Sequence, residues 1–357
     1  MSIVKPQEFS IDLTPQHRFE ITDISNRIKE MVKDEIHKYR KATYCSFHTT
    51  AGYLEQSLCS RLDNQIENIR SYIKAFQHLF PDNADYVHDN MDMRDELSHE
   101  ERQVEPKNAD SHLTFIGSGL RNCVTYVNKP DTPVYFIDLD GVSEFGKRKR
   151  MTSVMLYNQE ETVFEQKVEV PVSMHPIDSI NLRDPRLGYM SKLGELFQAY
   201  DIERGRVDIA LDPSEKHAGI TVNEYETLLM TYDLVEVLRN PMKFMGEKGK
   251  YLFHNPSKIA ERTKEYAKFD LVHIINEMMD SLHLSHSMIE KMMAKALAYP
   301  AEKFLRVKRK VSFIISNNGN DRTSEIISGR YQSPILVQWK PSEKLSRSVI
   351  LTITRYK

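Results

Sequence analysis

The chain has 357 residues, of which 40% are hydrophobic and 28% charged, a composition ordinary for a globular protein and a length sufficient for two domains. Its formal net charge of −2 excludes a global basic field, so neither nucleic acid nor an anionic membrane is expected as a partner. No apolar run approaches the roughly 20 residues of a spanning helix, and the N-terminus is no signal peptide. The sparse, odd set of Cys45, Cys59 and Cys123 predicts a cytoplasmic protein without a disulfide framework.

The first half predicts an α+β fold of antiparallel character, without a strict β-α-β alternation. Residues 21–39 carry apolar side chains at helical spacing, and residues 41–47 alternate like a strand. After the sequence HTTAG, residues 56–80 form one amphipathic helix that Pro81 ends, and the polar segment 82–111 is expected to be a long loop. Successive strands are then predicted at 122–127, 133–139, 150–158 and 164–172.

The second half repeats this order. Residues 191–200 predict a helix, 206–212 a strand and 223–238 a second helix, and strands follow much later at 310–315, 334–339 and 348–356. If Ala218–Gly219 matches Ala51–Gly52, the turns agree as well. We therefore predict an internal duplication with domains 1–173 and 188–357, a linker at 174–187, and a long helical insertion in the second domain. The alternative is chance, because helix–strand–helix order is common.

Motifs of the first half resemble a known family. FHTTAG, LFPDNADYVH, NADSHL and IGSGL occur in this order and resemble the YjbQ family, whose members are described as secondary thiamine-phosphate synthases. The resemblance covers roughly residues 21–172, and the second half is similar more faintly through KHAGITVNE and its last two strands. It implies two YjbQ-like α+β domains of strongly bent mixed sheet and a homo-oligomer, with the trimer as the family's usual state.

The family's three histidines correspond to His48, His88 and His112. Three neutral imidazoles can hold a divalent metal such as Zn²⁺ and leave one position open for water or substrate. A metal-free pocket for anion binding or proton transfer is the alternative. Mg²⁺ is a weaker expectation for a metal cofactor, because the chain offers no dense carboxylate cluster here.

Further residues are candidates for the same pocket. Asn108 lies four residues before His112 and could orient a ligand or cap a helix. The remaining candidates are substrate-binding, where a hydroxyl, a backbone amide or an ammonium would meet a phosphate: Thr49, Thr50, Gly117, Ser118 and Lys147. For these the alternatives are an ordinary turn or a solvated hairpin tip.

Two departures from the family pattern bear on function. The Gly-Thr-Trp-Gln sequence after the central strands is replaced by Gly146 and the basic run 147–150. In the second half Glu215 stands at the place of His48, which indicates a degenerate copy without a site.

Two functions of different classes therefore remain open. The first is a transferase of the thiamine-phosphate-synthase type, joining a pyrimidine diphosphate to a thiazole phosphate, or a related reaction on a phosphorylated small molecule. The second is a non-catalytic metal- or metabolite-binding protein or scaffold. Methionines in the long helical insertion could form an adaptable partner surface for the second, or could simply fill a core.

Overall fold

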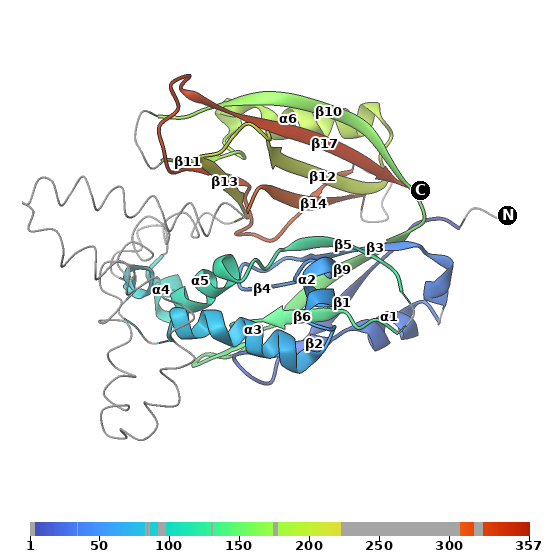
Figure 1. Ribbon diagram of the computed structural model, residues 1–357, viewed down its shortest axis with the longest axis vertical. Helices are drawn as coiled ribbons and strands as arrows, with labels where there is room; N and C mark the ends of the chain where they lie inside the picture. Colours follow the sequence, from blue (N-terminus) through green and yellow to red (C-terminus); the bar gives the residue numbers. More distant parts are fainter. Residues whose placement is uncertain are drawn as a thin grey trace, which may run out of the picture.

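The computed structural model describes residues 4–33, 35–82, 84, 86–91, 98–129, 131–173, 178–222, 308–317 and 324–357 (Figure 1). They form a mixed α+β protein whose sheets are antiparallel. No helix in this part of the chain is long and apolar enough to cross a membrane. The predicted helix 223–238, the long helical insertion and residues 174–177 of the predicted linker lie outside the described residues.

The first half contains a four-stranded sheet and a smaller three-stranded sheet. The larger sheet has, in spatial order, the strands β1 (Gln7–Leu13), β9 (Arg150–Tyr157), β3 (Lys41–Ser46) and β5 (Cys123–Val127). The smaller has β2 (Glu20–Asp23), β6 (Tyr135–Asp138) and β4 (Ala51–Gly52). A short hairpin of β7 (Val142–Ser143) and β8 (Gly146–Lys147) leads into β9.

The helices of this half are shorter than the sequence predicts. They are α1 (Ser25–Met31), η1 (Glu35–Lys38), α2 (Gln56–Arg61), α3 (Ile66–Leu79), η2 (Val87–Asp89), α4 (His99–Val104) and α5 (Ala109–Gly117). The single helix predicted over 56–80 breaks after α2, because Asp63 and Asn64 adopt positive φ of 56° and 52°, which short polar side chains tolerate. The predicted loop 82–111 contains η2, α4 and the start of α5.

The second half contains a five-stranded sheet and another three-stranded sheet. The larger has, in order, β10 (Glu160–Pro171), β17 (Ser346–Tyr356), β12 (Arg204–Leu211), β14 (Lys310–Ser316) and β15 (Glu325–Ile327). The smaller has β11 (Asp178–Asn181), β16 (Ile335–Gln338) and β13 (Ala218–Thr221). The turn η4 (Pro185–Leu187) precedes the helix α6 (Tyr189–Ala199).

The strand order is the same in the two halves. The order β1-β9-β3-β5 recurs as β10-β17-β12-β14, and β2-β6-β4 recurs as β11-β16-β13. Ala51 lies opposite Asp138 in its ladder, and Ala218 lies opposite Gln338 in the corresponding one. The Ala-Gly pairs predicted as turns thus lie in the strands β4 and β13, and a shared strand order with antiparallel pairing is what an internal duplication produces.

The chain passes from the four-stranded to the five-stranded sheet before the predicted linker at 174–187. Strand β10 pairs with β17 along its length, so residues 160–171 lie in the second sheet although the sequence places them in domain 1–173. Strand β9 ends at Tyr157 in the first sheet. The chain therefore passes from the first sheet to the second at residues 158–159. The sequence places this point too late because alternating apolar residues identify a strand but not the strand with which it pairs.

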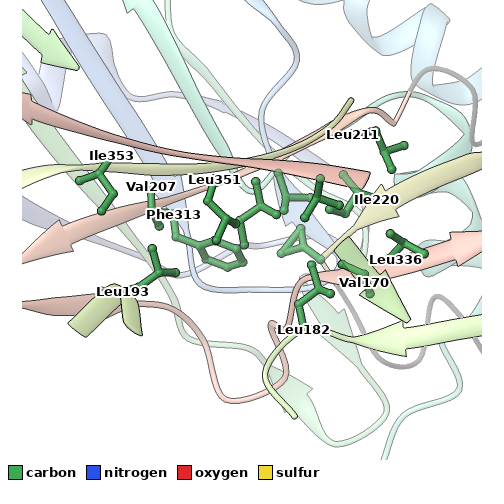
Figure 2. Packing of buried hydrophobic residues seen from close by; sticks show 14 of the residues in the cluster. Val170, Leu182, Leu193, Val207, Leu211, Ile220, Phe313, Leu336, Leu351 and Ile353 are labelled. Atoms are coloured by element: carbon green, nitrogen blue, oxygen red, sulfur yellow. The ribbon is translucent and has the colours of Figure 1, made fainter. Parts of the chain in front are cut away.

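Each half has its own apolar core. In the second half, side chains from β10, β12, β14 and β17 meet those of the small sheet and of α6, as Figure 2 shows around Phe313 and Leu351. Leu193 and Phe197 are the buried residues of α6, one turn apart on the face toward the sheet. Burying each such side chain stabilises the fold by about 1.5–3 kcal/mol.

The two halves are joined by a mixed apolar and polar interface. Cys45, Cys123 and Tyr157 of the first sheet pack with Ile314 and Tyr356 of the second, and the Tyr157 and Tyr356 rings stack with centroids 3.7 Å apart. In Figure 1 the second half lies above the first, with β14 next to β5. The second half also reaches the end of β3, where Gln332 Nε2 donates to the carbonyl oxygens of Ser46 at 2.9 Å and His48 at 3.1 Å.

Candidate functional site

Two of the three predicted histidines lie side by side. His88, in η2, and His112, in α5, are both buried, and their ring centroids are 5.2 Å apart. The Asp89 carboxylate accepts from His88 Nδ1 at 3.0 Å and from the backbone amides of Asn108 and Ala109 at 3.1 Å. Asp89 therefore caps the amino end of α5 and orients the His88 ring, whose Nδ1 carries the shared proton.

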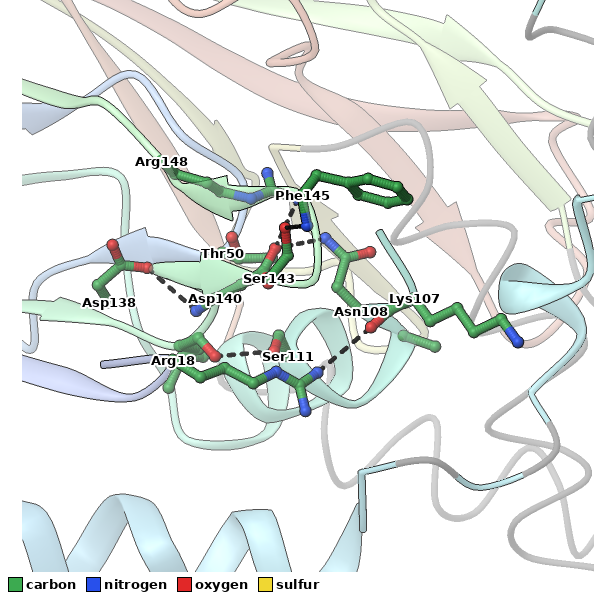
Figure 3. A network of polar contacts seen from close by, with 12 residues as sticks. Arg18, Thr50, Lys107, Asn108, Ser111, Asp138, Asp140, Ser143, Phe145 and Arg148 are labelled. Atoms are coloured by element: carbon green, nitrogen blue, oxygen red, sulfur yellow. Dashed lines mark hydrogen bonds and ion pairs between the residues drawn. The ribbon is translucent and has the colours of Figure 1, made fainter. Parts of the chain in front are cut away.

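Asn108 links this pair to a buried carboxylate. It occupies the N-cap position of α5, but its side chain makes no capping hydrogen bond. Instead its Nδ2 donates to Asp140 Oδ2 at 2.7 Å, and Arg148 pairs with the same oxygen at 2.9 Å (Figure 3). Burial raises the pKa of Asp140, and the positive charge of Arg148 opposes that shift.

A buried ion pair lies next in the network. Arg150 donates to both oxygens of Asp138, at 2.7 and 2.8 Å, and the two side chains are each only 3% exposed. The same guanidinium donates to the Asp140 carbonyl at 2.7 Å and to Thr50 Oγ1 at 3.3 Å. Asp138 Oδ1 in turn accepts from the Asp140 amide. These contacts fix the turn after β6 against the start of β9.

A second carboxylate–guanidinium pair borders the network. Arg18 Nη2 lies 2.7 Å from Asp110 Oδ1, and Ser111 Oγ donates to the Leu139 carbonyl at 2.9 Å. Burial raises the pKa of Asp110 to about 6, and Arg18 limits the rise. The sequence singled out Arg150 only as part of the basic run 147–150, and we did not predict Arg18, Asp89, Asp110, Asp138 or Asp140 as site residues. The one local signal was the alternating Asp138-Leu139-Asp140 at the end of an apolar strand.

The third histidine, His48, contacts the start of β9. Its Nε2 accepts the Met151 amide at 2.9 Å, so the proton of the neutral ring is on Nδ1. Burial, with the positive charges of Arg150 and Arg148, lowers the pKa of His48 to about 3. The ring is therefore a neutral hydrogen-bond donor through Nδ1 at any physiological pH.

The three rings as placed do not form a set of metal ligands. His88 and His112 are adjacent, but His48 Nε2 is engaged with a backbone amide. Across the described ranges, no group of three or more His, Cys, Asp or Glu side chains is arranged to hold a metal ion. The residues as placed thus do not fit the shared Zn²⁺ or Mg²⁺ site expected from the sequence.

The second half repeats this framework with different side chains. Glu215 Oε1 accepts the Ser348 amide at 2.9 Å, as His48 Nε2 accepts that of Met151. Arg347 pairs with Glu215 at 2.9 Å and donates to Gln338 Oε1 at 3.3 Å. It also donates to the Lys340 carbonyl, as Arg150 does to that of Asp140.

The correspondence shows which groups the second half lacks. Glu215 occupies the place of His48, as the alignment of the two Ala-Gly pairs predicts. Gln338 and Lys340 stand where the first half has Asp138 and Asp140. In the first half the buried Arg150 pairs with a carboxylate of the small sheet, Asp138. In the second half Arg347 pairs with Glu215, which lies in the turn before β13.

The titration of His48 gives a testable consequence. An unfolded chain protonates this ring below about pH 6.5, whereas the folded chain keeps it neutral until about pH 3. The unfolded state binds more protons in that window, so stability contributed by His48 is present at pH 7 and is lost as pH falls. His48→Gln cannot protonate and keeps an acceptor for the Met151 amide, so its stability should fall less between pH 7 and 4. Urea unfolding at the two pH values measures this, and a His48 NMR titration midpoint near 6.5 would contradict it.

No family model and no curated protein matches the chain. A YbjQ-like protein of unknown function from Sulfolobus solfataricus P2 is 14% identical, with a TM-score of 0.29, over 55% of this chain and 99% of that one. An uncharacterized conserved protein of the yjbq/upf0047 family from Clostridium acetobutylicum is 19% identical, with a TM-score of 0.28, over 42% of this chain and 98% of that one. The chain is similar in structure to YjbQ/UPF0047-family proteins over about half its length.

A hypothetical protein from Aeropyrum pernix K1 is also similar, at 13% identity and a TM-score of 0.30, over 43% of this chain and 99% of that one. The four sequence motifs and two of these similarities of structure name the same family.

The motif Ile-Gly-Ser-Gly of the YjbQ resemblance has a structural place in this chain. Gly117 ends α5, and the amides of Ser118 and Gly119 donate to helix carbonyls at 2.9 and 3.2 Å. Gly119 has φ of +74°, the left-handed conformation that commonly ends a helix. These amides are engaged at the carboxyl terminus of a helix, where the dipole is negative and does not favour an anion.

The other predicted substrate-binding residues lie closer to the network. Thr50 is buried against Arg150, whereas Thr49 is half-buried on the same turn. Lys147 is exposed on β8 and its ammonium contacts Gln16 Oε1. The basic run is thus divided, with Lys147 and Lys149 exposed on or after the hairpin and Arg148 and Arg150 turned toward the buried carboxylates.

Proposed function

We propose that the first half binds and converts a phosphorylated small molecule at the network around Asp140. The observation that carries the proposal is the buried Asp140 carboxylate, held between Asn108 and Arg148 beside a second buried ion pair. Burying such charges costs free energy of folding, so clusters of them are concentrated at functional sites. The corresponding positions of the second half lack both carboxylates, so the proposal assigns the site to the first half alone.

Partly exposed cations at the edge of the network support an anionic substrate. The Arg148 and Arg18 side chains are 28% and 33% exposed, and Lys147 is exposed on the hairpin next to them. A guanidinium binds a phosphate through two parallel hydrogen bonds, and an exposed ammonium adds a point charge. In this proposal Arg148 binds the phosphate, and His48 donates a hydrogen bond from Nδ1 while its ring stays neutral.

The type of reaction comes from the resemblance to the YjbQ family. A thiamine-phosphate synthase forms a C–N bond between a pyrimidine and a thiazole phosphate, while the C–O bond to pyrophosphate breaks and pyrophosphate leaves. Such a step needs donors to the leaving anion and a group that moves protons. Arg148 and Lys147 would serve the first need, and the His88–His112 pair the second.

Binding of pyrophosphate and thiamine phosphate to the whole chain tests the proposal. Calorimetric titration should show binding of both and not of unphosphorylated thiamine. Arg148→Gln should weaken pyrophosphate binding about tenfold or more, because a hydrogen bond to a charged group contributes about 1.5–3 kcal/mol. Arg186→Gln is the matched control, since that guanidinium is exposed in the second half and pairs with Asp184. Equal affinity in the two variants, or no binding at all, contradicts the proposal.

Turnover separates the enzyme from the alternative. Pyrophosphate release from the pyrimidine diphosphate and the thiazole phosphate, lost in His112→Ala, supports the transferase. Binding without release supports a non-catalytic metabolite-binding protein or scaffold. That alternative is favoured by one observation, namely that Asp110, Asp138 and Asp140 each already pair with an arginine of the chain.

A further inference from the structure

Two of the three cysteines lie directly opposite one another on neighbouring strands. Cys45 of β3 faces Cys123 of β5 in the ladder, and both thiols are free and buried. The Ser46 amide donates to the Asn122 carbonyl at 2.7 Å in the adjacent pair of residues. Hydrogen-bonded and non-hydrogen-bonded pairs alternate along an antiparallel ladder, so Cys45 and Cys123 form a non-hydrogen-bonded pair, the closer of the two kinds.

That geometry is compatible with a disulfide. Residues opposed in a non-hydrogen-bonded pair have Cα atoms about 4.5 Å apart and side chains on one face of the sheet. A disulfide needs Cα atoms about 4.4–6.8 Å apart, so the bond requires only a small adjustment. The Cys45 thiol already interacts with that of Cys123, which together with burial raises the pKa of Cys45.

A cavity between the two halves is lined in part by one of the two cysteines. It has a volume of about 200 Å³ and is lined by Cys123 and Thr125 of the first half and by Arg206, Lys310 and Ser312 of the second, among others. Glu55 and Glu160 line the same cavity, so side chains of both charges face it. A cavity of this size admits water or a small peroxide but not a bulky reagent. Cys45 does not line it and lies behind Cys123.

The pair is not a requirement of the fold. In the second half the corresponding opposed residues of β12 and β14 are Ala210 and Lys310. The same strand order is thus built there without a thiol on either strand. A buried pair of cysteines can simply fill a core, but the cavity at Cys123 gives this pair access that a core pair lacks.

We propose that Cys45 and Cys123 form an oxidation site that hydrogen peroxide converts to a disulfide. Cys123 attacks the peroxide oxygen, the O–O bond breaks, and a sulfenic acid and one water form. Cys45 then attacks the sulfenic sulfur, the S–O bond breaks, and a second water leaves. Two thiols and one hydrogen peroxide thus give one disulfide and two waters, with two electrons passing from sulfur to the peroxide.

The oxidised pair would act on the turn that carries His48. Cys45 precedes Ser46, whose hydroxyl donates to the Ala51 carbonyl at 2.7 Å and accepts the His48 amide at 3.3 Å. A covalent tie between β3 and β5 constrains the strand end from which this turn starts. The site is therefore a modification site next to the proposed functional network, and its existence does not depend on that function.

Hydrogen peroxide treatment of the folded chain, followed by peptide mapping without reduction, tests the proposal. We expect one cross-linked peptide pair containing Cys45 and Cys123, and a loss of two hydrogens from the intact mass. Cys59 is the internal control, because it is buried beside Tyr126 and is not among the residues that line the cavity. It should be oxidised at least about tenfold more slowly.

Two variants separate the steps. Cys45→Ser should leave a sulfenic acid on Cys123, which dimedone labels once the peroxide-treated chain is unfolded in urea, whereas Cys123→Ser should leave Cys45 unreacted. Peroxide in urea provides the reference for unrestricted access, and the wild-type peptide map remains decisive if a variant does not fold. Three free thiols in the folded chain at a peroxide dose that oxidises the unfolded chain would overturn the proposal, as would a cross-link to Cys59.

Discussion

Asp138→Ala is expected to lower the free energy of unfolding by about 3–5 kcal/mol, because it leaves the Arg150 guanidinium buried without its partner. Thr50 Oγ1 and the Asp140 carbonyl would still accept from Arg150, but neither carries a charge. Urea unfolding followed by circular dichroism measures the change. The matched control is Glu161→Ala, whose ion pairs with Arg355 and Lys357 lie at the surface, and its effect should be much smaller. Similar losses in the two variants would contradict the assignment of a buried pair.

A double variant tests whether the two halves solve the same electrostatic problem. Asp138→Gln installs the amide that Gln338 supplies in the second half, and His48→Glu installs the carboxylate of Glu215. Each single change should lower the free energy of unfolding. The double variant should lose less than the sum of the two single losses, because Glu at position 48 can pair with Arg150. A double-mutant cycle measures this coupling. Strict additivity would show that the positions are not equivalent.

Gly329→Ala should destabilise the contact between the halves. A Cβ at this position would lie 1.9 Å from the Phe47 carbonyl oxygen and 2.8 Å from its carbon, so backbone must move. Forcing atoms into a packed contact costs about 1–3 kcal/mol or more. The same movement would disturb Gln332, whose side chain donates to the His48 carbonyl. Thermal unfolding should show a lower midpoint, and the His48 NMR signal should shift.

Gly194→Ala is the matched control for this change. Gly194 lies within α6, and a Cβ there would meet no atom within 4 Å. The substitution should raise the free energy of unfolding by about 0.5–1 kcal/mol, because alanine favours a helix interior over glycine. Opposite signs in the two variants would locate the effect at the contact with Phe47. A neutral or stabilising Gly329→Ala would refute the close approach.

Local patterns by themselves identified the longer strands of both halves and the correspondence between the halves, but not the bounds of the helices. Alternating apolar residues identify the strands around Tyr44 and Ile209, because side chains of a strand point to opposite faces in turn. The shared pairs Ala51–Gly52 and Ala218–Gly219 set one alignment, and this alignment places His48 and Glu215, each three residues before its Ala-Gly pair, at equivalent positions. Such inferences need only neighbouring residues.

Tertiary structure alone decided the pairing of strands and the electrostatics of the network. The sequence identifies residues 164–172 as a strand, but only the ladder with β17 shows that it belongs to the second sheet. Nothing local shows that Asp138 lies against Arg150 or that the Met151 amide occupies His48 Nε2. These contacts join residues far apart in the chain, and the pKa of each group depends on burial and on charges that only the folded chain brings near.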